Sequence, residues 1–163
     1  MLDIYTVAFF GHRRIYNYNI LEKLLMQQIK KLVNENEHVD FLVGHNGDFD
    51  TLVSSCIKNF QSDYGNYNNS LILVLPYSTA EYENNRESFE NYYNDIEICY
   101  ESSVAFPKSS IEIRNRKMID RADLVICYVE ENKGGAYKAM QYALKIGKPI
   151  LNLAEKMFAN FVC

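Results

Sequence analysis

Five short apolar runs recur along the chain, and segments with the spacing of amphipathic helices separate most of them. Runs of this length that are rich in β-branched and aromatic residues are typical of buried strands. Strands that alternate with helices predict βαβ units with right-handed crossovers. We therefore expect a doubly wound α/β fold, with a mainly parallel five-stranded sheet and helices on both of its faces. The expected strands are residues 4–10, 39–43, 71–75, 124–129 and 150–153.

The helical segments begin and end at recognisable signals. Asp48 precedes a periodic apolar segment and is expected to cap its helix. Ser109 and Glu112 have the spacing of a capping box. Gly147 and Pro149 end the helix before the last strand. The expected helices are about 17–34, 49–60, 109–121 and 135–146, with a short one at the end of the chain.

One segment breaks this alternation. From about residue 77 to 108 the chain is polar, acidic and rich in tyrosine, with little periodicity. A connection of this length inside a compact domain is usually functional, mobile or partly helical. Because no linker or repeat is apparent elsewhere, we expect a single domain over residues 1–163 that carries this insert.

Bulk properties restrict the class of protein. The formal charge of −4 and the isoelectric point near 5.4 argue weakly against nucleic acid as the main partner, which needs a basic surface; a local basic patch is the open alternative. No apolar run is long enough to span a membrane, and the N-terminus lacks a signal peptide, so we expect a cytoplasmic protein. The histidines lack the spacing of metal ligands. The cysteines form no C-x-x-C pair and are expected to be reduced and non-catalytic; they are Cys56, Cys99, Cys127 and Cys163.

Glycine-bearing turns follow three of the predicted strands. They are Gly11-His12-Arg13, residues 44–48 and Gly134-Gly135. In a parallel α/β sheet such turns meet at one edge, where ligands bind. Glycine lets backbone N–H groups approach a phosphate, and a helix N-terminus favours an anion there. The turns therefore predict a nucleotide- or phosphate-binding site, although each could also be an ordinary tight or flexible turn.

Polar side chains near these turns suggest specific roles. Arg13 can pair with a phosphate. Asp48 or Asp50 can accept a hydrogen bond from a ribose hydroxyl while the other caps a helix. His12 is either an acid–base group or a structural donor. Arg114, early in its helix, is the preferred ligand contact of its segment, whereas solvated charge is the alternative for Arg116 and Lys117. The residues expected at the ligand are Gly11, His12, Arg13, Gly44, Asn46, Gly47, Asp48, Asp50, Arg114, Asn115, Gly134 and Gly135.

Several of these segments resemble a known family. Residues 7–13 resemble the F-x-G-H-R opening of the bacterial YpsA-like proteins of the SLOG superfamily, and residues 41–50 are similar to their second turn, G-x-x-G-x-D. Residues 114–123 and 133–136 look like their C-terminal half. The likeness covers most of the chain outside the 77–108 insert. It implies a Rossmann-like fold that binds a nucleotide or a nucleotide-derived ligand.

The same superfamily includes the DNA-processing protein of natural transformation, DprA, and the cytokinin-activating phosphoribohydrolases of the LOG group. The latter carry P-G-G-x-G-T-x-x-E after the fourth strand and an arginine in the preceding helix. Arg114 matches that arginine, but the glycine loop is reduced to Gly134-Gly135, and Lys138 stands near the place of the glutamate. This departure puts glycosidase activity in doubt.

Three functions follow from this interpretation. The first is binding of a nucleotide-derived small molecule, such as an ADP-ribose- or NAD-like ligand, for sensing, sequestration or regulation, with tyrosines of the insert stacking on the base. The second is an N-glycosidase, with Arg114, Glu130 and Glu131 as catalytic candidates. The third is a protein-interaction role with a vestigial pocket. We expect a nucleotide-type ligand, no metal, no membrane association and no nucleic acid; a homodimer is an open alternative.

Overall fold

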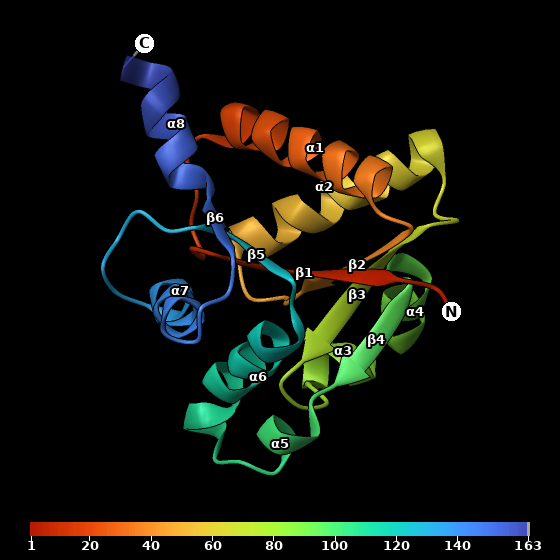
Figure 1. Ribbon diagram of the computed structural model, residues 1–163. Helices are drawn as coiled ribbons and strands as arrows, with labels where there is room; N and C mark the ends of the chain where they lie inside the picture. The colour runs from red at the N-terminus through yellow and green to blue at the C-terminus, as the bar shows by residue number, and fades with distance from the viewer. Residues whose placement is uncertain (163) are drawn as a thin grey trace.

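The computed structural model describes residues 1–162, with side chains to residue 157, and its centre is a six-stranded sheet (Figure 1). The strands lie in the order β4-β3-β2-β1-β5-β6, and every neighbouring pair is parallel. The central strand β1 pairs with β2 on one side and β5 on the other, so that Ala8 lies between Leu42 and Val125. The strands are β1 (Ile4–Gly11), β2 (His38–Val43), β3 (Asn69–Leu75), β4 (Asp95–Ile98), β5 (Leu124–Tyr128) and β6 (Ile150–Asn152).

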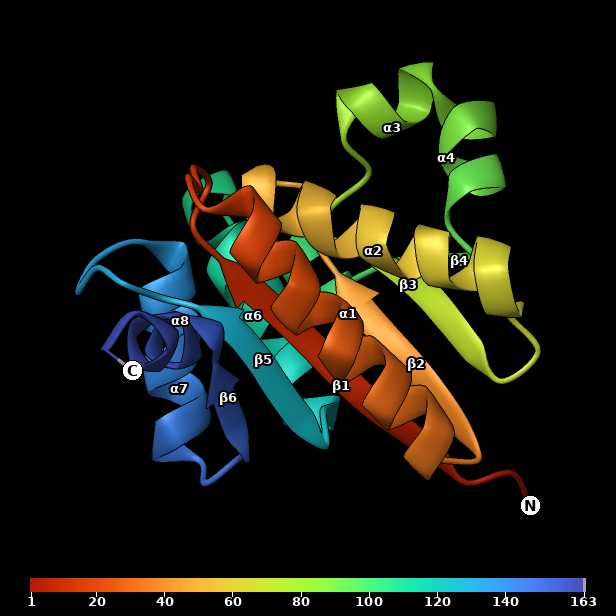
Figure 2. The same ribbon diagram turned by 90° about the horizontal axis from the view of Figure 1, so that it is seen from above.

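Helices cover both faces of the sheet, as predicted (Figure 1). Alternate residues of β1 point to opposite faces, so Val7 and Phe9 join one apolar cluster while Ala8 and Phe10 join the other. The first face carries α1 (Tyr18–Glu35), α2 (Asp48–Tyr64) and α8 (Leu153–Val162), and α3 (Ala80–Asn84) and α4 (Arg86–Tyr92) lie beside α2 (Figure 2). The second face carries α5 (Tyr100–Ser103), α6 (Pro107–Arg121) and α7 (Gly135–Lys145).

The prediction of five strands is wrong, because the insert contains a sixth. Strand β4 has only four residues, Asp-Ile-Glu-Ile, and pairs with β3 alone at the edge of the sheet. Its side chains are partly or fully exposed, and an exposed strand does not require a run of apolar residues. The sequence therefore contains no apolar run at this strand. The rest of the insert folds into α3, α4 and α5. The insert thus contains the crossover from β3 to β4, made of α3 and α4, and α5 begins the connection to β5.

Two predicted helix caps are also wrong. Asp48 is the first residue of α2, Gly47 occupies the cap position, and no side chain caps the helix. Helix α6 begins at Pro107, two residues before the predicted capping box, and Phe106 is its cap residue. Proline suits this position because its missing N–H would have no partner there. The N–H of Ser109 instead donates to the carbonyl oxygen of Phe106 at 2.9 Å.

Among the described residues, no helix has both the length and the apolar character of a membrane span, and no cluster of three or more His, Cys, Asp or Glu side chains could hold a metal ion. Cys56, Cys99 and Cys127 are free thiols. Burial raises the pKa of the Cys56 and Cys127 thiols to about 12. Cys163 lies outside the described residues.

Candidate functional site

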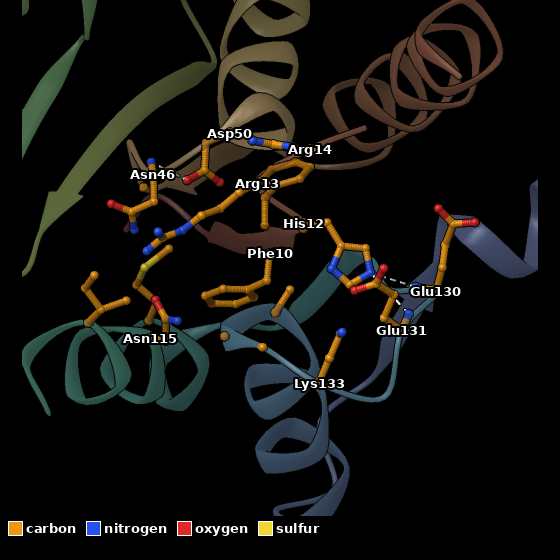
Figure 3. Close-up of a pocket in the computed structure, with 18 of the residues that line it drawn as sticks. Phe10, His12, Arg13, Arg14, Asn46, Asp50, Asn115, Glu130, Glu131 and Lys133 are labelled. Carbon is orange, nitrogen blue, oxygen red and sulfur yellow. Dashed lines mark hydrogen bonds between the residues drawn. The ribbon is translucent and has the colours of Figure 1, made fainter. Parts of the chain in front are cut away.

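A pocket of about 600 Å³ opens at the carboxyl edge of the sheet (Figure 3). The loops after β1, β2 and β5 meet there with α6 and the N-terminus of α7. Strands β1 to β4 follow one another toward one edge of the sheet, whereas β5 lies on the other side of β1. The pocket therefore occupies the point where the strand order reverses, which is the usual ligand position in an open parallel sheet.

Most of the residues predicted to contact a ligand line this pocket, although they come from four distant segments. Gly47 and Asp48 do not. The predicted residues that line it are Gly11, His12, Arg13, Gly44, Asn46, Asp50, Arg114, Asn115, Glu130, Glu131, Gly134 and Gly135.

Gly47 and Asp48 support the loop after β1. A Cβ atom on Gly47 would lie 2.5 Å from the Cα atom of Arg13. The N–H of Asp48 donates to the carbonyl oxygen of Arg13 at 2.8 Å, and its carboxylate accepts the N–H of Ile15 at 3.2 Å. This packing gives the Arg13 loop its position, so the two residues act on the pocket through Arg13.

Two of the glycines that line the pocket are required for different structural reasons. A Cβ atom on Gly11 would lie 2.1 Å from the ring of Phe49, so glycine lets α2 pack directly on β1. Gly134 has φ of +91°, a conformation that L residues rarely adopt, and it forms the N-cap of α7. The first provides close packing within the protein, and the second turns the chain into the helix whose N-terminus borders the pocket.

His12 joins two of the loops. Its Nε2 atom accepts the backbone N–H groups of Glu130 at 2.9 Å and of Glu131 at 3.3 Å, as the dashed lines in Figure 3 mark. The ring also packs edge to face on Tyr128, with 6.0 Å between ring centres. The Nε2 atom is thus an acceptor in a contact between two loops, whereas the structural alternative predicted for His12 was a donor.

Arg114 is the most deeply buried charged residue near the pocket, with 2% of its surface exposed. Its Nη1 atom donates to the carbonyl oxygen of Val74 at 2.7 Å, and its Nε atom donates to Asn115 Oδ1 at 2.9 Å. Burial lowers the pKa of its guanidinium, while the charge of Asp50 acts in the opposite direction. Two of its N–H groups thus donate to other residues of the protein, and the side chain lines the pocket wall.

Asp50 faces Arg114 across Gly44. A Cβ atom on Gly44 would lie 3.1 Å from Asp50 Oδ2 and 3.2 Å from both Nη atoms of Arg114. Asp50 Oδ2 also accepts the N–H of Asn46 at 2.9 Å. Burial raises the pKa of the Asp50 carboxyl, and the Asn46 hydrogen bond and Arg114 oppose that rise. The absence of a side chain at Gly44 leaves room for the side chains of Asp50 and Arg114 to approach each other at the pocket wall.

The two glutamate candidates lie on the exposed loop after β5. The hydroxyl of Tyr128 donates to the Glu130 carboxylate, which raises the pKa of the already desolvated Tyr128 phenol. The backbone N–H of Glu131 donates to His12, and the residue lines the rim of the pocket.

Sequence reasoning missed several lining residues and placed the aromatic groups wrongly. Tyr82 and Tyr93 of the insert are buried in the core beside Phe89 instead of reaching this pocket. Tyr16, which is 80% exposed, and Phe10 supply the aromatic groups here. Lys133 also lines the pocket (Figure 3). Its position directly before the Gly134-Gly135 turn could have identified it from the sequence as a lining residue.

The pocket continues along α6 and α7 into a smaller hollow of about 280 Å³, and the two share Arg13, Asn115 and the Gly134-Gly135 turn. Seven basic and four acidic residues line the two together, a formal local charge of +3 on a chain of net charge −4. The acidic ones are Asp50, Glu112, Glu130 and Glu131. The basic ones are Arg13, Arg14, Lys108, Arg114, Arg116, Lys133 and Lys138.

No family model matches the sequence, and no curated protein sequence is significantly similar to it. Solved structures do share its fold. DNA processing protein A from Helicobacter pylori matches 90% of this chain with a TM-score of 0.63 and 22% identity. DprA from Streptococcus pneumoniae matches 90% with a TM-score of 0.63 and 18% identity. This chain spans 63% and 49% of the length of those two chains. The predicted relation of the fold to DNA-processing proteins is therefore confirmed.

These neighbours correct the predicted function and partner. The Helicobacter protein has a described single-stranded DNA binding mode, so the partner named for that neighbour is a nucleic acid and not a small nucleotide derivative. On this finding the prediction of a small-molecule binding module is wrong. The expectation that nucleic acid is an unlikely partner is wrong as well. The glycosidase and vestigial-pocket alternatives gain no support. The charge argument failed because net charge averages over the whole surface, whereas the two hollows gather an excess of cations.

Proposed function

We propose that the protein binds single-stranded nucleic acid, most specifically single-stranded DNA, along the two joined hollows at the carboxyl edge of the sheet. The observation that carries this proposal is the local excess of basic residues on a chain that is acidic overall. A strand of phosphates is a linear polyanion, and such grooves follow its backbone with lysine and arginine. The described binding mode of the Helicobacter neighbour supports the choice of DNA.

The hollows also supply backbone groups suited to phosphate. Helix α7 begins at Gly135, and no side chain caps it. The first N–H groups of a helix lack intrahelical partners and form a favourable anion site with the helix dipole. Nothing in the described structure would meet a Cβ atom on Gly134 or Gly135 within 4 Å, so a phosphate can approach this backbone closely.

Aromatic groups at the entrance suit the bases. Tyr16 is 80% exposed and lies on the pocket wall with Phe10. Proteins that bind single strands without sequence preference combine a basic groove with aromatic side chains on which bases stack. An exposed tyrosine beside Arg13 and Arg14 provides both interactions.

We also propose that the chain is a YpsA-like member of the SLOG superfamily and that residues 1–163 form one domain of it. Support comes from the F-x-G-H-R and G-x-x-G-x-D resemblances and from the fold shared with DNA-processing proteins.

The test measures binding of a fluorescently labelled oligothymidylate by anisotropy over a salt series. For single strands, each phosphate contact adds about 0.7 to the magnitude of the slope of log K against log salt. We expect Lys138→Ala to weaken binding and to reduce that slope by about 0.7. Lys31→Ala, an exposed lysine of α1 on the opposite face of the sheet, is the matched control and should leave both unchanged. Absence of saturable binding by the wild-type protein, or equal slopes for wild type and Lys138→Ala, would overturn the proposal.

A further inference from the structure

A second pocket, of about 320 Å³, lies between α2 and α4 and has walls rich in aromatic rings. Figure 2 shows α4 beside α2 and away from α6 and α7. The rings come from His45, Phe89, Tyr92 and Tyr93. Three of these four rings belong to the insert, which contributes no aromatic ring to the main pocket.

The rings form an edge-to-face cluster. His45 and Phe89 have ring centres 5.2 Å apart at 62°, and Tyr92 and Tyr93 have centres 4.9 Å apart at 78°. Hydrogen bonds position His45, with Nδ1 3.2 Å from the Tyr93 hydroxyl and Nε2 3.2 Å from Glu81 Oε1. Tyr92 remains 38% exposed. A planar aromatic guest can therefore pack on rings that the protein already holds in place.

One polar group in this pocket lacks a partner. Ser54 is only 3% exposed and lines the pocket, and its Oγ atom has no hydrogen-bond partner among the described residues. Leaving a buried hydroxyl unpaired is unfavourable, and native structures usually avoid it. A hydroxyl can both donate and accept, so it can pair with the polar edge of a base. The hydroxyl lies close to the Tyr93 phenol and gives the aromatic pocket a polar group, which suits a guest that is both planar and polar.

Consecutive residues of the loop after β2 line the two pockets. His45 lines the aromatic pocket, while Gly44 and Asn46 on either side of it line the main pocket. Lys58 lies over the ring of Tyr92, with Nζ 5.4 Å from its centre, and places a cation beside the aromatic pocket. A chain of phosphates that leaves the main pocket across Asn46 would meet this side of the molecule next.

From these contacts we infer that the aromatic pocket receives one unstacked base of the single strand whose backbone occupies the main pocket. The inference rests on the proposed function and adds a base-binding subsite to it. A single strand suits this pocket better than a duplex, because a base of a duplex must first be unstacked and unpaired before it can enter a side pocket.

The experiment compares a normal oligothymidylate with an abasic oligonucleotide of the same length, which keeps the phosphates and lacks the bases. Tyr92→Ala should weaken binding of the normal strand about 5- to 150-fold, as expected for loss of one base–aromatic stack. It should leave binding of the abasic strand unchanged. Tyr92→Phe keeps the ring and should bind both strands as the wild type does. Tyr67→Ala, at an 85% exposed tyrosine in the loop before β3, is the matched control.

The abasic strand separates loss of the subsite from misfolding, since a misfolded variant would lose both strands. Equal weakening of the two strands by a Tyr92→Ala variant with the wild-type circular dichroism spectrum, or normal binding of both strands by Tyr92→Ala, overturns the inference. The proposed function stays in place if Lys138→Ala still lowers the salt slope. Failure of the wild-type protein to bind either strand overturns both.

Discussion

The Nε2 atom of His12 accepts the backbone N–H of Glu130 at 2.9 Å, and this contact joins residues 118 positions apart. His12 follows β1 and Glu130 follows β5, so the hydrogen bond spans the point where the strand order reverses. The same atom accepts the N–H of Glu131. One imidazole thereby holds the loop that leads to Lys133 and the N-terminus of α7.

Replacing His12 with alanine should loosen this loop more than it destabilises the domain. Two partly exposed hydrogen bonds correspond to a loss of about 1–2 kcal/mol in the free energy of unfolding. We expect amide hydrogen exchange at Glu130 and Glu131 to accelerate, while core amides of β1 exchange more slowly than either. Exchange followed by NMR and urea unfolding would check both parts. Unchanged protection of the two amides would show that His12 does not hold the loop.

The Gly134-Gly135 pair allows a matched comparison. Gly134 has φ of +91°, so Gly134→Ala should lower the free energy of unfolding by about 1–3 kcal/mol. Gly135 is the first residue of α7, with a φ outside the left-handed region and open space around its Cβ position. Gly135→Ala should therefore be neutral or stabilising by less than about 1 kcal/mol. Thermal unfolding of both variants is the measurement, and equal destabilisation would contradict the assigned backbone roles.

Asp50 should make the stability fall as the pH rises. Burial raises the pKa of its carboxyl in the folded protein above the ordinary value of 3.8. Between the unfolded and folded values the folded state binds more protons, so the free energy of unfolding decreases as the pH rises through that window. The contribution of Asp50 is complete below 3.8 and is lost above the folded-state pKa.

Asp50→Asn should remove this decrease and give a flatter stability profile from acidic to neutral pH. Urea unfolding across that range is the measurement. Asp63→Asn, at an exposed position of α2, controls for the loss of one negative charge. A profile for Asp50→Asn with the same downward slope as the wild type would show that another group is responsible.

Local apolar pattern was sufficient to place five of the six strands, because each of them contains neighbouring apolar residues that are buried or partly buried. Strand β4 escaped detection because an edge strand of four residues with exposed side chains leaves no such run. The meeting of Gly11, Gly44 and Gly134 at one pocket was also foreseeable, since parallel strands end at the same edge.

The α/β alternation, the parallel sheet and the edge at which its turns meet follow from local sequence, because they depend on the periodic burial of neighbouring residues. The packing of distant segments, by contrast, makes Gly47 and Asp48 support Arg13 and directs Arg114 to the carbonyl oxygen of Val74. The same packing brings tyrosines of the insert together with His45 in a separate pocket. Side-chain direction, burial and local charge arise from residues far apart in the chain, and no window of sequence contains them together.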